Sequence, residues 1–245
     1  MTTKEIIRCF ASSKPDRQFS RKELLSWIHD MGLSGNSTEA LISLSLNRML
    51  NSGELTKESW GTYTLATQDR YFYMPIPSEE IGEIYRFLKT DLPYTNYCVW
   101  NPQVIVPFMR HIPNLQMLIV EVEKIAIESA FNFLQNKGLS RRLFINPSKD
   151  DYSHYVNGIP SIIVKPLVSQ APLIDFGGVK MPTIEKIMVD IYGDVDFAYA
   201  QGSELYTIYE NILSSYQINY KALYRYADRR GRRSQIEDIL NTLKI

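Results

Sequence analysis

The N-terminal 70 residues limit the choice of fold more than any other part of the chain. Residues 3–12 have apolar side chains at helical spacing. Ser20 and Glu23 have the separation of a capping box that begins a second helix. After the turn LSGNS, a third helix is expected to run to about Asn51, with Ser37 or Asn36 as its cap. Its inward-facing residues are expected to be Leu41, Ile42, Leu46, Met49 and Leu50.

Two short runs with strand-like composition follow these helices. Residues 54–57 and 61–65 flank a turn at Ser59-Trp60-Gly61, which is the pattern of a hairpin. The order helix, helix, turn, helix, hairpin is that of a winged helix-turn-helix. We therefore predict a winged helix over residues 1–70 that binds duplex DNA, with its third helix in the major groove.

The expected DNA contacts follow from this geometry. On the third helix, Thr38, Ser43 and Asn47 should meet base edges, with Ser37 near the backbone. Phosphates should be held by Arg17, Arg21, Lys22 and Arg48, and the wing should contribute Lys57 and Trp60.

The charge of the chain sets a limit on this interpretation. Lys+Arg and Asp+Glu are both 27, so the net charge is zero. DNA binding must then come from a local basic face, because a neutral chain has no overall attraction for phosphate. Arg48 is the single basic residue expected on the third helix. A winged helix that binds protein and no nucleic acid is the alternative.

The rest of the chain predicts a second domain. Residues 71–94 should form a connector and a helix. Strands are expected at 97–100, 117–122, 142–145, 161–165 and 173–174, with a helix at 126–137 and a polar surface loop at 146–158. From Pro182 the pattern is helical to the C-terminus. The predicted fold class is α+β: an N-terminal winged helix followed by an α/β domain, residues 95–245, that ends in a helical bundle.

The C-terminal helices carry a recognisable pattern. The segment MPTIEKIMVDIYGD at 181–194 and the segment INYKALYRYADRRGRRSQIEDIL at 218–240 resemble the C-terminal domain of AbiE-type abortive-infection antitoxins. The matching residues are Pro182, Glu185, Lys186, Val189 and Asp190, then Ile218, Asn219, Leu223, Tyr226 and Ala227. The resemblance implies a winged helix that represses the operon's own promoter, and a C-terminal domain that counteracts a nucleotidyltransferase-type toxin.

Two acidic pairs offer possible chemistry. Glu121 and Glu123 lie two apart in LIVEVEK, so both are expected on one face of a strand, where they could hold the metal of a nuclease. Lys124 comes one residue later than such nucleases require, so a metal-dependent nuclease is the minor alternative. Asp194 and Asp196 follow Gly193, and a solvated turn is the favoured interpretation.

The most basic stretch lies between residues 220 and 233. Its arginines are Arg225, Arg229, Arg230, Arg232 and Arg233. They could face outward and bind the toxin or another acidic partner, or they could cap helix carbonyls, and the sequence favours neither.

Other function classes have little support in the sequence. There is no phosphate-binding glycine loop and no serine-hydrolase elbow. The two cysteines lie far apart, and no apolar run is long enough to span a membrane. The overall expectation is a cytoplasmic transcriptional autoregulator and antitoxin with no catalytic residues, cofactor or metal. Its partners would be double-stranded DNA and the toxin.

Overall fold

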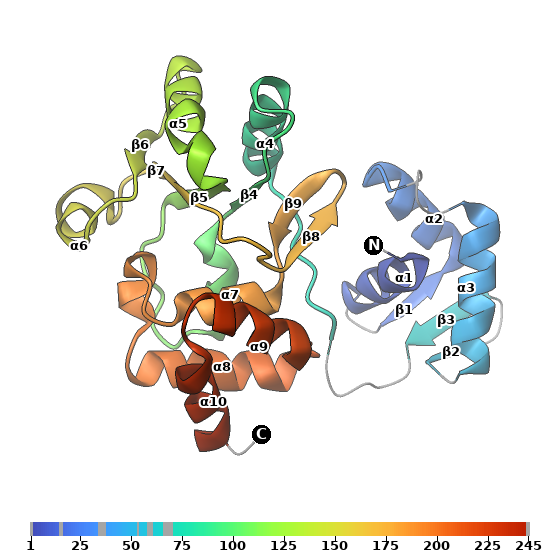
Figure 1. Cartoon of the computed structure of the whole chain (residues 1–245). Helices are drawn as coiled ribbons and strands as arrows, with labels where there is room; N and C mark the ends of the chain where they lie inside the picture. Colours follow the sequence, from blue (N-terminus) through green and yellow to red (C-terminus); the bar gives the residue numbers. More distant parts are fainter. Residues whose placement is uncertain are drawn as a thin grey trace. The chain divides into compact units, whose positions relative to one another are not determined.

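The computed structural model describes residues 2–14, 17–33, 38–52, 54–57, 61–65 and 71–243. It is a mixed α and β structure (Figure 1). The chain divides into two compact units. Unit 1 is Met1–Met74 with Asp175–Gly178 and Ser214–Gln217, and unit 2 is Pro75–Ile174, Val179–Leu213 and Ile218–Ile245. The first boundary lies close to the predicted one at residue 70, and the expected connector helix belongs to unit 2.

Unit 1 consists mainly of short helices and a small antiparallel sheet. Its elements are α1 (Thr3–Ser12), β1 (Gln18–Ser20), α2 (Arg21–Asp30), α3 (Glu39–Asn51), β2 (Leu55–Lys57) and β3 (Thr62–Leu65). β3 pairs with both β1 and β2, so the strand order is β1-β3-β2. The predicted hairpin strands are confirmed, whereas β1 was not predicted because three residues are too few to show an alternating pattern.

Local capping sets where the helices of unit 1 begin. The predicted box of Ser20 and Glu23 is present at the start of α2, and Thr2 with Glu5 forms a second box on α1. The cap of α3 is Thr38, whose hydroxyl accepts from the backbone N–H of Leu41. Thr38 therefore takes the role expected for Ser37 or Asn36, which lie outside the described residues.

The core of unit 1 joins all of these helices. It includes Ile6, Ile7, Phe10, Phe19, Leu24, Ile28, Ile42, Leu46, Met49 and Leu55. On α3 the buried face is set by Ile42, Leu46 and Met49. Leu41 was expected to face inward, but its side chain is 46% exposed. The reason is rotation: with 3.6 residues per turn, a position one residue before Ile42 is turned by about 100° from it.

The sheet of unit 2 carries strands of both directions. Helix α4 (Glu79–Asp91) comes before β4 (Tyr97–Trp100) and β5 (Met117–Val122), and α5 (Ile127–Asn136) comes before β6 (Arg142–Ile145) and β7 (Ser161–Pro166). The order is β4-β5-β7-β6, with β4 antiparallel to β5 and the other pairs parallel. Figure 1 shows α4 and α5 side by side at one end of this unit. The predicted bounds of β4, β5 and β6 are confirmed.

One predicted loop is wrong. Residues 146–158 contain α6 (Lys149–Asp151) and a π-helical turn, η5 (Tyr152–Val156). Ser148 and Asp151 form a capping box at the start of this segment. Tyr152 and Val156 are buried in a core that also contains Met117 and Ile163. Because they are four residues apart, Tyr152 and Val156 lie on the same side of the turn, which faces the core. The residues between them are exposed to solvent.

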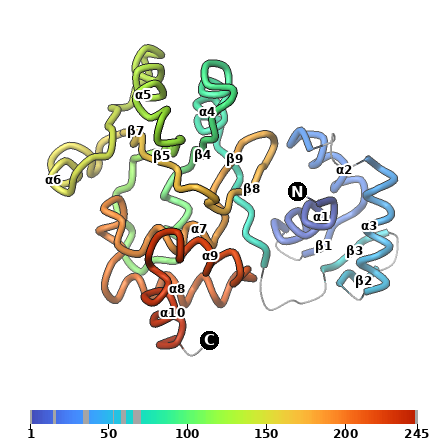
Figure 2. Tube along the Cα trace, viewed as in Figure 1, coloured from blue at the N-terminus to red at the C-terminus, as the bar shows by residue number. Residues whose placement is uncertain are grey.

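The C-terminal third is mostly helical. After β8 (Leu173–Phe176) and β9 (Val179–Pro182), it contains α7 (Ile184–Ile191), η6 (Val195–Ala200), α8 (Ser203–Ser215), α9 (Tyr220–Arg229) and α10 (Arg233–Thr242). In unit 2, α7 packs against α9, and α9 against α10 (Figure 2). All side chains of α7 are buried. Within the described ranges, no helix combines the length and the apolar character that crossing a membrane would take.

An ion-pair group in unit 1 predicts a dependence of stability on pH. The carboxylate of Glu54 accepts from Lys4 Nζ at 2.5 Å and from Arg8. Partial burial opposes ionisation, but hydrogen bonds from Lys4, Arg8 and Ser52 outweigh it and lower the pKa of Glu54 from 4.5 to about 2. The folded state binds the proton more weakly than the unfolded chain does. This contribution to stability is therefore complete above pH 4.5 and is lost as the pH falls toward 2.

We expect Glu54→Gln to be less stable than the wild type at pH 7 and to lose less stability than the wild type on acidification from pH 5 to pH 2. The free energy of unfolding of the full chain, measured by urea titration at a series of pH values, checks this. Equal losses in the two proteins over this range would contradict it.

Candidate functional site

Unit 1 presents α3 as a half-exposed helix. Three residues predicted to meet DNA are exposed: Thr38 at its cap, and Asn47 and Arg48 on the helix. Ser43 is less available, because its hydroxyl donates to the Glu39 carbonyl of the same helix at 2.9 Å. Asn47 and Arg48 therefore provide the long polar side chains on the exposed side of α3.

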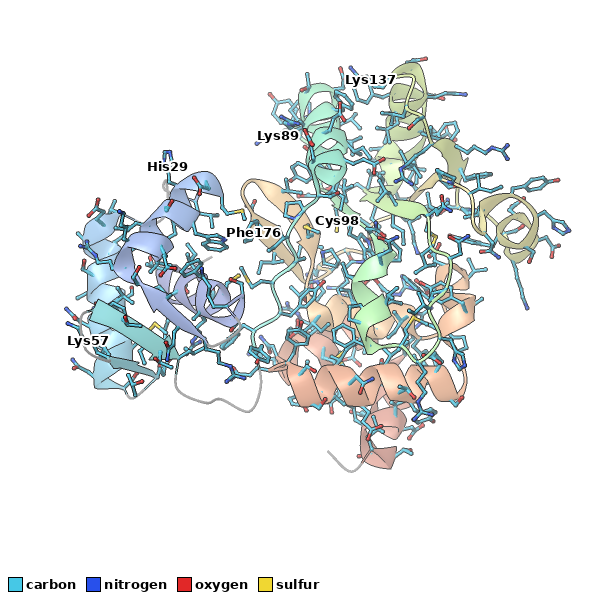
Figure 3. The ribbon with its side chains drawn as sticks, turned by 180° about the vertical axis from the view of Figure 1, so that it is seen from behind. His29, Lys57, Lys89, Cys98, Lys137 and Phe176 are labelled. Atoms are coloured by element: carbon cyan, nitrogen blue, oxygen red, sulfur yellow. The ribbon has the colours of Figure 1, made fainter. Side chains whose placement is uncertain are left out.

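The predicted phosphate contacts fall into two groups. Lys22 and Lys57 are exposed, and Lys57 lies at the outer edge of unit 1 (Figure 3). Arg17 stacks on the ring of Tyr71 at 4.4 Å and donates to its hydroxyl at 2.5 Å. Arg21 forms an exposed ion pair with Glu39 at 3.1 Å, which solvent screens and which is easily exchanged for another anion. Ser37 and Trp60 lie outside the described residues.

The exposed side of α3 also carries apolar side chains. Leu41 and Leu44 are 46% and 45% exposed. They lie three residues apart, so they are neighbours on the helix surface. Sequence reasoning missed this feature, because it placed Leu41 in the core.

Unit 2 contains a buried group of charges, which we call the charge cluster. Its members are Glu121, Lys165, Lys186, Asp190, Asp194, Asp196, Arg230 and Arg232. The strands β5 and β7 contribute one residue each. The others come from α7, from η6 and the residue just before it (Asp194), and from the turn between α9 and α10. The cluster therefore joins the sheet to the C-terminal helices.

Lys186 lies at one end of the charge cluster. Its side chain is completely buried, and its Nζ is 2.6 Å from Glu121 Oε2 and 2.6 Å from Asp190 Oδ2. Lys186 and Asp190 are one helical turn apart on α7, whereas Glu121 comes from β5. Asp190 also accepts from the hydroxyl of Tyr226 on α9 at 2.9 Å, and Arg230 Nε lies 3.8 Å from its Oδ1. Asp190 therefore packs α7 against α9 beside an arginine.

Asp194 and Asp196 lie at the other end of the charge cluster. The prediction of a solvated turn is wrong, because both carboxylates are paired and their side chains are only 9% and 4% exposed. Lys165 on β7 contacts both of them, at 3.4 Å for Asp194 and more closely for Asp196. Arg230 and Arg232 each donate to Asp194, and the hydroxyl of Tyr152 donates to Asp196. Sequence reasoning had no signal for these partners, which lie 29 or more residues away along the chain.

Burial and pairing act against each other on the pKa values in the charge cluster. Burial raises the pKa of Glu121 above its ordinary value, since the charge of Lys186 offsets only a part of that effect. Burial acts on Asp190 in the same way, but the charges of Lys186 and Arg230 outweigh it and lower its pKa. For Lys186, burial is likewise outweighed by Asp190 and Glu121, which raise its pKa. The lysine therefore stays charged between its two carboxylates.

The acidic pair considered for a nuclease does not form. Glu121 lies in β5, which ends at Val122, so Glu123 is outside the strand and does not share its alternation. The Glu123 carboxylate accepts from the side chain of Asn96 at 2.5 Å, whereas Glu121 pairs with Lys186. Over the described parts of the chain, no group of three or more histidine, cysteine, aspartate or glutamate side chains is arranged to hold a metal ion.

The structure divides the basic stretch into inward and outward arginines. Arg230 and Arg232 point to Asp194, and Arg232 Nη1 donates to the carbonyl of Val189 near the end of α7 at 3.1 Å. This agrees with the interpretation that arginines cap a helix. Arg225 and Arg229 are exposed on α9. Arg233 stacks on Tyr224 at 4.2 Å and pairs with Asp228 and Glu237.

The comparison with protein families places most of the chain in one of them. The model of a family of unknown function, DUF6577, matches residues 41–245. The match begins within α3 and includes all of unit 2. No curated protein matches the chain.

The burial of Lys186 yields a prediction for stability. Replacing one partner of a buried ion pair leaves the others uncompensated, which costs about 3–5 kcal/mol. We expect Lys186→Met to lower the free energy of unfolding by this amount, because Glu121 and Asp190 would both remain. Adding Glu121→Gln should restore a part of the loss. Urea titration of the full chain measures both variants.

The matched control is Lys89→Met on the exposed surface of α4, which should change the free energy of unfolding by less than about 0.5 kcal/mol. A Lys186→Met protein as stable as this control would show that the buried pairing contributes nothing.

Proposed function

The chain belongs to DUF6577, a family of unknown function, and we propose that it is a cytoplasmic DNA-binding autoregulator whose N-terminal unit is a winged helix-turn-helix. The order of elements in unit 1 supports the proposal: α1, α2 and α3 are followed by the antiparallel pair β2 and β3. In such a module the third helix enters the major groove, and the hairpin lies beside it as a wing.

The observation that carries the proposal is the exposed polar side of α3. Asn47 and Arg48 are exposed, while Ile42 and Met49 anchor the helix in the core. Asparagine can pair with the major-groove edge of adenine, and arginine binds guanine or phosphate. Lys57 at the end of β2 is exposed as well, where a wing would meet the backbone of the duplex.

The neutral net charge of the chain is compatible with this role, because salt at physiological concentration screens the interaction between DNA and distant charges on the protein. The Debye length there is about 8 Å, so an acidic surface elsewhere on the chain has little effect on a phosphate near Arg48. The affinity then depends on a few cations, and it should be modest and sensitive to salt.

We further propose that the chain is the antitoxin of a pair, acting on a nucleotidyltransferase-type toxin. The support is the sequence pattern shared with AbiE-type antitoxins. Residues of this pattern bond to one another in the structure. The backbone N–H of Asn219 donates to Glu185 at 2.8 Å, and the Tyr226 hydroxyl donates to Asp190, so the motif residues join α9 to α7. The exposed Arg225 and Arg229 on the outer side of α9 are the proposed contacts to the toxin.

Leu41 and Leu44 favour a second candidate, in which unit 1 binds a protein partner through α3. Exposed leucines at neighbouring helix positions are typical of a helix that packs in a groove of its partner. They can also contact thymine methyl groups in a major groove. Only the DNA-binding function predicts salt-sensitive binding of a duplex that weakens when positive charge is removed, and the first experiment below tests this.

For the DNA-binding proposal, the measurement is the fluorescence anisotropy of labelled duplex from upstream of the gene, titrated with the full chain at several salt concentrations. We expect Arg48→Ala and Lys57→Ala each to weaken binding and to reduce the slope of log K against log salt by about 0.9, one phosphate contact. Asn47→Ala should cost about 1–3 kcal/mol on the preferred sequence and less on others.

Lys89→Ala removes an equal charge from α4 and serves as the control, with no expected change. No salt-sensitive binding to this duplex would overturn the proposal. Binding of DNA that is unchanged in Arg48→Ala and Lys57→Ala would place the DNA contact elsewhere on the chain and reject the role of α3.

For the antitoxin proposal, co-expression with a neighbouring nucleotidyltransferase gene should relieve the growth arrest that this gene causes alone. The double variant Arg225→Glu, Arg229→Glu should relieve it less, because reversed charges repel a partner surface that fits the arginines. Growth arrest that persists with the wild-type chain, at a confirmed expression level, would contradict the proposal.

A further inference from the structure

A pocket opens beside the charge cluster at the carboxyl ends of the parallel strands of unit 2. Its volume is about 390 Å³, and its polar lining consists of Asn146, Lys165, Asp194, Asp196 and Arg230. This volume lies within the range of small-molecule sites. In open sheets with parallel strands, ligands commonly bind outside the carboxyl ends of the strands.

The two strands bring the lining residues together. Lys165 is close to the end of β7, and Asn146 directly follows the last residue of β6. The backbone N–H of Asn146 donates to the carbonyl of Val164 at 3.0 Å, which holds it next to β7. The apolar part of the lining includes Pro147, Ile163 and Val195. The pocket thus has a charged side and an apolar side.

The acceptors on the charged side are already in use. One oxygen of Asp194 accepts from Arg230 and Arg232, and the other faces Lys165. One oxygen of Asp196 accepts from Tyr152, and the other from Lys165. Each carboxylate oxygen that lines the pocket has an internal donor, so these groups have little capacity left for a cationic ligand.

Donors, in contrast, remain available. A guanidinium has five N–H groups, and in the described part of the chain Arg230 uses Nη2 on Asp194 and has Nε 3.8 Å from Asp190. Its Nη1 has no partner there, and neither has the side-chain amide of Asn146, a residue exposed at the pocket. The Asn146 amide can donate and accept, whereas the Arg230 nitrogen can only donate, so unused donors outnumber unused acceptors and suit a ligand with acceptor oxygens.

The backbone at Asn146 is a second and independent indication. Its φ is +43°, in the left-handed region that most residues with a side chain avoid. Asparagine tolerates this region better than other residues, but it remains sparsely populated. Such conformations are concentrated at ligand-binding positions, and here the conformation occurs at the residue that lines the mouth of the pocket.

We propose that this pocket binds a small organic anion. Its oxyanion group, a phosphate monoester or a carboxylate, accepts hydrogen bonds from Arg230 and Asn146 near the charge of Lys165, and its organic part rests on Pro147, Ile163 and Val195. The charges of the cluster balance one another, so affinity comes from direct hydrogen bonds and apolar contact. This site is independent of DNA binding by unit 1.

The test measures binding to the full chain by isothermal titration calorimetry, with three probes. A nucleoside 5′-monophosphate represents organic phosphates, benzoate represents organic carboxylates, and inorganic phosphate has no apolar part. We expect saturable binding of one organic probe, which identifies the oxyanion class, and weaker binding of inorganic phosphate.

Two variants connect the binding to the pocket. Asn146→Gly removes the amide and suits the positive φ, so it should fold normally. Arg230→Lys keeps the charge and loses the fork of donors. Each should weaken the organic probe about tenfold, the effect of a lost hydrogen bond to a charged group. Arg225→Lys on the exposed side of α9 is the matched control and should bind as the wild type does.

Three results would overturn the proposal. The first is the absence of binding by both organic probes at millimolar concentration. The second is binding of inorganic phosphate without either organic probe, which would indicate an adventitious ion only. The third is binding of an organic probe that is equal in the wild type, Asn146→Gly and Arg230→Lys, since this would place the site elsewhere.

Discussion

The buried ammonium group of Lys186 is the constraint on which the arrangement of unit 2 depends. A charge without access to water is strongly unfavourable unless opposite charges surround it. Glu121 from β5 and Asp190 from α7 provide this at 2.6 Å each. Because Lys186 lies on α7 and Glu121 on β5, their ion pair connects the helix to the sheet at this point.

The other charges extend this constraint to the C-terminal helices. Asp190 is bonded to Tyr226 on α9, and Asp194 to the arginines of the turn that leads to α10. The residues of the antitoxin-like pattern lie in this part of the structure and make internal bonds. A pattern of this kind identifies a way of packing helices on a sheet. The surfaces proposed to meet DNA, a toxin or a small anion consist of other residues.

In unit 1 the proposed function depends on exposed side chains of α3, whereas the charged groups of unit 2 described above are paired inside the protein. Its core is apolar and shared by α1, α2 and α3, and the outer side of α3 combines Asn47 and Arg48 with Leu41 and Leu44. A face of mixed character suits a duplex, which offers phosphates, base edges and methyl groups in one groove. Unit 2 has a different kind of candidate site, a pocket where donors exceed free acceptors. The chain therefore presents two surfaces with separate chemistry.

The sequence by itself determined the features that depend on neighbouring residues. The box of Ser20 and Glu23, the strands at 97–100 and 117–122, and the helices of the C-terminal third follow from capping and periodicity, whose physical causes act within a few residues. Only the tertiary structure decided where the charges go. Asp194 and Asp196 looked like a solvated turn, and Tyr152 like part of a polar loop, because their partners are distant along the chain: Lys165 and Arg230 for the aspartates, and Asp196 for Tyr152. The charge cluster and the pocket beside it form where the strand ends, η6 and the α9–α10 turn come together. These segments are far apart along the chain, so no local sequence pattern predicts their contact.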